Sequence, residues 1–155
     1  MSIRFLALET QLVRALQEGA PDANGQVPER HVSPGSGIPC RHCLAPVAAG
    51  EPYLILAHRP FPAPQPYAEV GPIFLHARPC ARAEPGAEVP PMLASPRYLV
   101  RGYGGDHRIV YGSGRIVDTP DIPAAARAML EDGRIVYVHV RSASNNCYQC
   151  RIERA

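Results

Sequence analysis

Hydrophobic and polar residues alternate most clearly near the end of the chain, over residues 134–141. Three valines occupy every second position there, at 136, 138 and 140, which is the period of a β-strand. We expect the valine face to belong to the core. His139 and Arg141 share the opposite face, two residues apart, where a functional site could use both side chains.

Other segments carry the signature of a strand, either alternation or a short apolar run bounded by glycine and proline. Tyr53–His58 is a near-continuous apolar run and is predicted to be buried. Arg97–Tyr103 and His107–Tyr111 predict a hairpin, because Gly104-Gly105-Asp106 between them is a favoured turn composition. The remaining predicted strands are Ser2–Leu8, Arg30–Val32, Gly71–His76, Arg115–Val117 and Cys147–Arg154.

Two segments have helical features. In Glu9–Gly19, apolar residues at positions 12, 13 and 16 form one face, and the last glycine would end the helix. Thr119 and Pro120 make a favourable start for a second helix, with threonine as N-cap and proline at the first helical position. This helix continues over Ala124–Asp132.

The order of these elements predicts an α+β fold: a mainly antiparallel, bent sheet with two helices. A chain of 155 residues is of the size of one domain, so we expect residues 1–155 to form a single domain. The 18 prolines and 13 glycines make up one fifth of the chain and predict long loops between the elements.

Charge gives little indication of a partner. The formal net charge is only +2 and the arginines are scattered, so a nucleic-acid partner is unsupported. No stretch is long and apolar enough for a membrane span, and the first residues lack the features of a secretory signal. We therefore expect a cytoplasmic protein without a membrane partner. A small-molecule or a protein ligand is compatible with the composition.

The strongest chemical signal is a pair of CxxC motifs, Cys40–Cys43 and Cys147–Cys150. In the reducing cytosol such pairs more often bind a metal or do redox work than form structural disulfides. Zinc takes four thiolate or imidazole ligands in a tetrahedron. The two pairs together would make a four-cysteine site. Alternatively, Cys40 and Cys43 with His76 and Cys80 would make a site of three cysteines and one histidine.

Three features count against the four-cysteine set. The separation of Cys43 from Cys147 far exceeds the roughly 12–20 residues of compact zinc modules. The glycine that usually follows a zinc-knuckle cysteine is replaced by Leu44 and by Arg151. In a regular strand, Cys147 and Cys150 would also face opposite sides of the sheet, and only a bulge or turn between them would let both reach one ion.

Two alternatives need no metal. Free cysteines are often small buried hydrophobic residues, which suits Cys150 and also Cys80. A reversible disulfide between Cys40 and Cys43 would be a redox centre. Thioredoxin-like motifs, however, sit after a strand and open a helix, and the prolines at 39 and 46 make a helix at these cysteines unfavourable.

A thiol-dependent enzyme is a different class of function. Cys43 or Cys147 would be the nucleophile, and His139 or His76 would be the base. Arg141 or Arg101 would then bind an anionic group of a small-molecule substrate. This hypothesis predicts a cleft that contains His139, Arg141 and a cysteine together. The metal hypothesis predicts a non-catalytic binding module in which the ligand cysteines converge on one point.

Several short motifs resemble a known family. They are Cys40-Arg41-His42-Cys43-Leu44, Gly50-Glu51, Pro66-Tyr67, Gly71-Pro72-Ile73-Phe74 with His76 and Cys80, Arg101-Gly102-Tyr103, His139-Val140-Arg141, and Cys147-Tyr148 with Arg151. In this order and over essentially the whole chain, they resemble the bacterial family called domain of unknown function 1203. The resemblance implies a fold shared with that family and assigns no activity.

Overall fold

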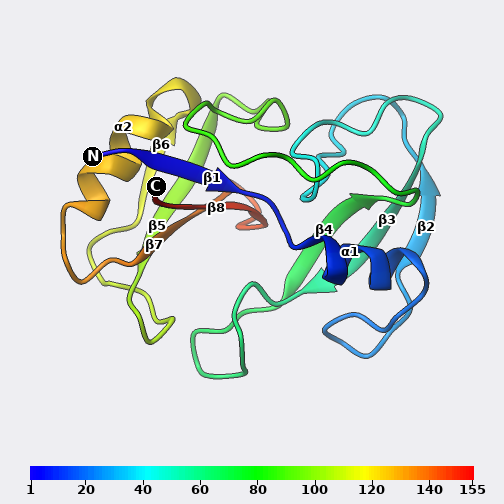
Figure 1. Cartoon of the computed structure of the whole chain (residues 1–155), viewed down its shortest axis with the longest axis horizontal. Coiled ribbons are helices and arrows are strands. Elements are labelled where there is room, and N and C mark those ends of the chain that lie inside the picture. Colours follow the sequence, from blue (N-terminus) through cyan, green and yellow to red (C-terminus); the bar gives the residue numbers. More distant parts are fainter.

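The computed structural model describes residues 1–155 and contains two antiparallel sheets and two short helices (Figure 1). The five-stranded sheet has the order β1 (Ile3–Leu6), β8 (Tyr148–Arg154), β7 (Tyr137–Ser142), β5 (Arg97–Tyr103) and β6 (Arg115–Asp118). The three-stranded sheet has the order β2 (Glu29–Val32), β3 (Pro52–His58) and β4 (Gly71–His76). The predicted α+β class, antiparallel pairing and two helices are confirmed.

Helix α2 (Ile122–Leu130) packs on the five-stranded sheet. Its buried residues are Ile122, Ala126, Met129 and Leu130, which recur at helical spacing and face the sheet. They share one hydrophobic cluster with Val138 and Val140 of β7 and with Ile152 of β8. A 3₁₀ turn over Thr119–Asp121 leads into this helix.

Helix α1 (Thr10–Gln17) packs against the three-stranded sheet (Figure 1). Val13 and Leu16 are its buried residues, and they join a second hydrophobic cluster with Leu54 and Leu56 of β3 and with Leu75 of β4. The sheets therefore have separate cores, each with its own helix. Neither helix is long and apolar enough to cross a membrane.

Strand β8 connects the two cores. Tyr148 at its start belongs to the cluster of the small sheet, whereas Cys150 two residues later belongs to the cluster of the large sheet. The buried guanidinium of Arg41, from the loop before β3, donates to the carbonyl oxygen of Tyr148 at 2.9 Å. The first residues of β8 thus lie where the loops of the small sheet meet the large sheet.

The predicted hairpin of Arg97–Tyr103 with His107–Tyr111 is confirmed only in its short part next to the turn. Tyr103 and Ile109 form an antiparallel bridge, and the amide of Val110 donates to the carbonyl oxygen of Gly102 at 3.0 Å. The first half of β5 pairs with β6 instead of with residues 107–111. His107 adopts a left-handed conformation with φ +63°, which turns the chain out of a regular strand.

Two further predictions need correction. Thr119 does not cap α2, because its hydroxyl donates to the carbonyl oxygen of Ser95. Val136 is exposed, since β7 begins only at Tyr137. The face of β7 opposite Val138 and Val140 is also buried, and His139 on that face is fully covered.

Candidate metal centre

The ligand atoms of four residues converge at one point: Cys40, Cys43, His76 and Cys80. All four lie within 4.8 Å of one another, so the cluster could hold a metal ion. The sulfur atoms of Cys40 and Cys80 are 3.9 Å apart, and the sulfur of Cys43 is 3.5 Å from Nδ1 of His76. This is the set of three cysteines and one histidine expected from the sequence as the alternative.

A tight turn brings the first two cysteines together. Pro39 and Pro46 pair in an isolated antiparallel bridge, and the amide of Cys40 donates to the carbonyl oxygen of Ala45 at 3.0 Å. Leu44 closes the turn with φ +54°, the left-handed conformation that glycine usually supplies. Its side chain is only 3% exposed within the core of the large sheet, so burial compensates the backbone cost. The missing glycine therefore does not exclude a knuckle-like turn.

The histidine of the cluster, His76, lies at the end of strand β4. Cys40 forms a parallel bridge with Phe74, which places the cysteine turn beside the end of β4. His76 is the last residue of that strand, and its amide donates to the sulfur of Cys40 at 3.3 Å. Amide donors of this kind stabilise a thiolate.

The loop after β4 supplies the fourth ligand and is fixed by α1. Arg14 donates to the carbonyl oxygen of Cys80 at 2.9 Å. Gln17 donates to the carbonyl oxygens of His76 and Arg78 at 2.9 and 3.0 Å. One face of α1 is buried in the small core while its polar side chains hold the segment that carries two of the four ligands.

His42 supports the cluster from outside. It is fully buried, with Nδ1 at 3.1 Å from the sulfur of Cys80 and Nε2 at 2.9 Å from the hydroxyl of Thr10. With Cys80 as a thiolate, Nδ1–H donates to the sulfur and the Thr10 hydroxyl donates to Nε2. Burial lowers the pKa of His42, which favours this neutral form. Outer partners of this kind orient metal ligands.

The thiols of the cluster influence one another's ionisation. Hydrogen bonding from Cys43 lowers the pKa of Cys40 to about 4. Hydrogen bonding to Cys40, followed by burial, raises the pKa of Cys43. Burial first, and then the charge on Cys40, raises the pKa of Cys80 to about 11. Without a cation the cluster therefore favours a single thiolate, whereas a bound divalent ion would stabilise all three.

The second CxxC pair lies outside this cluster, so the structure does not assemble the four-cysteine set. Cys150 is 1% exposed and packs in the core of the large sheet, as a small hydrophobic residue does. Cys147 precedes β8 and is partly exposed. β8 does have an irregularity, since Val140 pairs with Cys150 and Arg141 with Tyr148. It still does not bring the pair to Cys40.

The other residues considered for catalysis lie apart from the metal cluster. Arg141 and Cys147 line one cavity of about 200 Å³, and His139 does not line it. Glu69 accepts from Arg101 at 2.7 Å and pairs with Arg141 at 3.2 Å. No described cavity contains His139, Arg141 and a cysteine together.

Sequence reasoning did not predict the role of several residues around these sites. His42 stands between the two cysteines of the first motif, where it was considered only as a group that lowers the pKa of a redox thiol and not as a support for Cys80. His58, Tyr148 and Arg151 line a larger cavity together with His139. With His139 they come from three strands, β3, β7 and β8, so no local pattern connects them.

Comparison with known proteins gives one match. The model of the family described as protein of unknown function (DUF1203) matches residues 37–154, which include all four residues of the metal cluster. No curated protein and no solved structure matches the chain. Since the match spans most of the sequence, the chain belongs to the DUF1203 family of proteins of unknown function.

Proposed function

We propose that this protein is a non-catalytic binding module stabilised by one zinc ion, which Cys40, Cys43, His76 and Cys80 hold. The observation that carries the proposal is the convergence of four ligand atoms within 4.8 Å. With usual zinc bond lengths, the sulfur–sulfur edge of a tetrahedron is about 3.8 Å and the sulfur–nitrogen edge about 3.5 Å. The Cys40–Cys80 sulfur pair, at 3.9 Å, and the Cys43–His76 pair, at 3.5 Å, agree with those edges.

The donor set favours zinc over other ions. Thiolates select zinc or other soft metals, whereas calcium and magnesium require oxygen ligands. Four protein ligands fill a tetrahedral site and leave no position for a substrate, which is typical of structural zinc. The amide and His42 hydrogen bonds to the sulfurs of Cys40 and Cys80 support the same role, since they stabilise thiolates and orient them.

A zinc ion here would add a common link between segments that otherwise contact one another through backbone and side-chain hydrogen bonds. The cysteine turn, the end of β4 and the loop with Cys80 would share one ion, and α1 is hydrogen-bonded to that loop. We infer that zinc fixes the small sheet with α1 as a rigid unit against β8.

The thiol enzyme has less support. Arg141 donates to Nδ1 of His139 at 3.2 Å, so that nitrogen is occupied as an acceptor and is unavailable as a base. His76, the other candidate base, belongs to the metal cluster. Among the candidate nucleophiles, Cys43 is a proposed ligand, and Cys147 has no histidine partner in its hydrogen bonds.

Elemental analysis of the untagged protein, with a thiol titration, tests the proposal. We expect about one zinc per chain and three further reactive thiols after a strong chelator is added. The variant Cys147→Ser is the matched control, because it removes a cysteine outside the cluster and should keep the zinc. Protein without zinc, in which Cys40, Cys43 and Cys80 titrate freely from the start, would contradict the proposal.

A further inference from the structure

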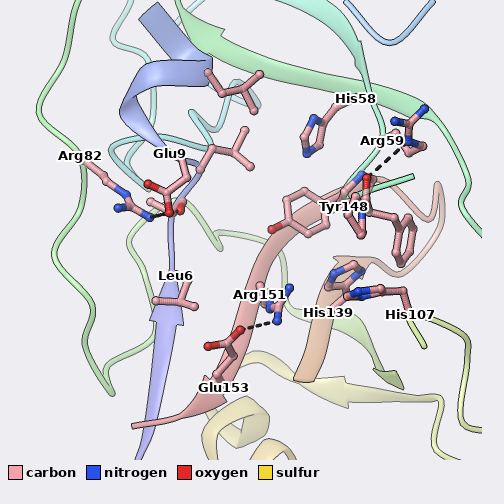
Figure 2. A pocket seen from close by; sticks show the side chains of 16 residues that line it. Leu6, Glu9, His58, Arg59, Arg82, His107, His139, Tyr148, Arg151 and Glu153 are labelled. Atoms are coloured by element: carbon pink, nitrogen blue, oxygen red, sulfur yellow. Dashed lines mark hydrogen bonds and ion pairs between the residues drawn. The ribbon is translucent and has the colours of Figure 1, made fainter. Parts of the chain in front are cut away.

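A cavity of about 470 Å³ lies on the side of the molecule where α1, β3 and β8 approach one another (Figure 2). Its walls come from the segment that joins β1 to α1, from the residues after β3, and from one face of β7 and β8. None of the four metal ligands lines it. The volume is that of a small-molecule site, in the range of about 300–1,000 Å³.

Hydrogen-bonding atoms without partners are concentrated at this cavity. Five buried side-chain nitrogens in the protein have no hydrogen-bond partner, and four of them belong to residues that line it. They are Nε2 of His58, Nε of Arg82, Nε2 of His139 and Nε of Arg151. Folded proteins pair nearly all buried polar groups with protein, water or ligand atoms, so unpaired nitrogens around one cavity mark it as a place where a polar partner binds.

The proton on His139 is fixed by its neighbour. Arg141 has only donors, so its contact of 3.2 Å with Nδ1 makes that nitrogen an acceptor and leaves the proton on Nε2. His139 lines this cavity and Arg141, which contacts Nδ1, does not, so we infer that Nε2 is the nitrogen that faces it. Burial, then the charge of Arg141, keeps the pKa of His139 well below its usual value. His139 is therefore a neutral hydrogen-bond donor.

The aromatic rings around His139 hold this donor in place. Tyr103 lies with its ring centre 4.6 Å from that of the histidine, and Tyr148 lies at 4.9 Å in an edge-on arrangement. Phe61 covers another side at 5.3 Å. The ring is fully buried, so its position is set before any ligand arrives.

Arg151 stands beside His139 on the same face of the sheet. The two residues are direct cross-strand partners of β7 and β8, so both side chains point into the cavity. The guanidinium of Arg151 stacks on the ring of Tyr137 at 3.7 Å. In Figure 2, Tyr148 extends between His58 and Arg151, and its hydroxyl has no hydrogen-bond partner in the chain. Three donors, one from β7 and two from β8, thus line the same cavity.

The charge of the walls favours an anion. The charged residues that line the cavity are three arginines, Arg59, Arg82 and Arg151, and two glutamates, Glu9 and Glu153. Both glutamates are already paired, Glu9 with Arg82 at 3.0 Å and Glu153 with Arg151. Arg59 contacts only a carbonyl oxygen, so one positive charge remains without a counter-charge. Beside these charged residues and the histidines, the lining has an apolar part with leucines at 6, 8 and 12 and with Phe61.

We propose that this cavity binds a small molecule with one oxyanion group, a carboxylate or a phosphate, on an apolar body. The oxyanion accepts hydrogen bonds from Nε2 of His139, the guanidinium of Arg151 and the hydroxyl of Tyr148. The apolar body packs on the leucines and Phe61. This assigns a ligand class to the proposed binding module and in that respect rests on the proposed function, although it needs no residue of the metal cluster.

Calorimetric titration with three probes that share one chain tests the proposal: hexanoate, hexyl phosphate and hexan-1-ol. We expect one or both anions to bind at one site per chain while the alcohol does not bind. The anion that binds more tightly identifies the head group. In the histidine ¹⁵N spectrum of the unmodified protein, the bound anion should shift Nε2–H of His139 and leave Nδ1 unprotonated.

Substitution locates the site. Arg151→Gln should weaken binding of the anion by about ten- to a hundred-fold, since it removes a hydrogen bond to a charged group. Arg97→Gln is the matched control, because Arg97 is exposed and pairs with Asp118 outside the cavity, and it should bind like the unmodified protein. Failure of both anions to bind, equal binding of the alcohol, or an unchanged affinity in Arg151→Gln would overturn the proposal.

The zinc content of the same sample separates this proposal from the previous one. Anion binding by a protein without zinc would contradict the metal centre and leave the cavity proposal in place. A zinc-containing protein that binds neither anion would contradict only the cavity proposal.

Discussion

Replacing Cys80 with serine is expected to lower the free energy of unfolding of the zinc-loaded protein by more than about 4 kcal/mol. Structural zinc contributes about 10–16 kcal/mol of binding free energy in small zinc modules, and loss of one of four ligands removes a large share of it. Cys80 is only partly buried and lies in a loop, so serine would cost little there if the sulfur had no metal to bind.

Thermal unfolding checks this result. For a domain of this size, a loss of about 4 kcal/mol lowers the melting temperature by about 10 °C. A chelator should reduce the melting temperature of the unmodified protein by a similar amount and should change that of Cys80→Ser little. Cys147→Ser is the control, since it removes a partly exposed thiol outside the cluster and should stay within about 0.5 kcal/mol of the unmodified protein. Equal stability of the two variants would show that Cys80 holds no metal.

The second large effect is expected at Glu69, whose carboxylate joins three segments. One oxygen accepts from Arg101 at 2.7 Å and lies 3.2 Å from Arg141, and the other accepts from Asn146 at 2.9 Å. The side chain of Arg141 is only 4% exposed. Loss of the carboxylate in Glu69→Ala leaves this buried positive charge without its partner, which costs about 3–5 kcal/mol for a fully buried pair. Because Glu69 is itself partly exposed, we expect about 2–3 kcal/mol.

Urea unfolding of two glutamate variants measures this difference. Glu51→Ala is the matched control, because Glu51 pairs with the exposed Arg78 at 3.5 Å and should cost no more than about 1 kcal/mol. If Glu69→Ala lowered the free energy of unfolding no more than Glu51→Ala does, the carboxylate of Glu69 would not stabilise the buried charge of Arg141. The pair matters beyond stability, since Arg141 also fixes the proton on His139.

The secondary structure was largely predictable because most strands have local signals. Tyr53–His58 and Gly71–His76 are apolar runs bounded by loop residues, and both agree closely with β3 and β4. The region 107–111 was predictable only in part. Its composition is that of a strand and it pairs with the end of β5 at Tyr103, but His107 is left-handed and only β6 pairs with the first half of β5.

The candidate metal residues were predictable as a set of alternatives, and the choice between them was not. Both CxxC motifs have the same spacing, yet the first forms a tight turn and the second begins a strand with Cys150 in the core. The turn at Cys40–Cys43 was not predictable, because it needs a left-handed residue at position 44. Leucine rarely adopts that conformation, and here its side chain is buried in exchange.

The anion cavity could not have been predicted from sequence. Alternation places His139 opposite the valines of its strand, and nothing local indicates that Phe61 and Tyr148 cover that face. Arg151 is the cross-strand neighbour of His139 because of the register between β7 and β8. That register shifts between Val140 and Arg141, which a sequence pattern does not predict. Such a site depends on long-range packing alone.

Zinc K-edge X-ray absorption on the protein as purified tests the central claim most directly, because it identifies the atoms bound to the metal. The proposed centre predicts three sulfurs at about 2.3 Å and one nitrogen at about 2.0–2.1 Å. A shell of four sulfurs would contradict it and require another cysteine in place of His76, and a protein without bound zinc would contradict the metal centre altogether.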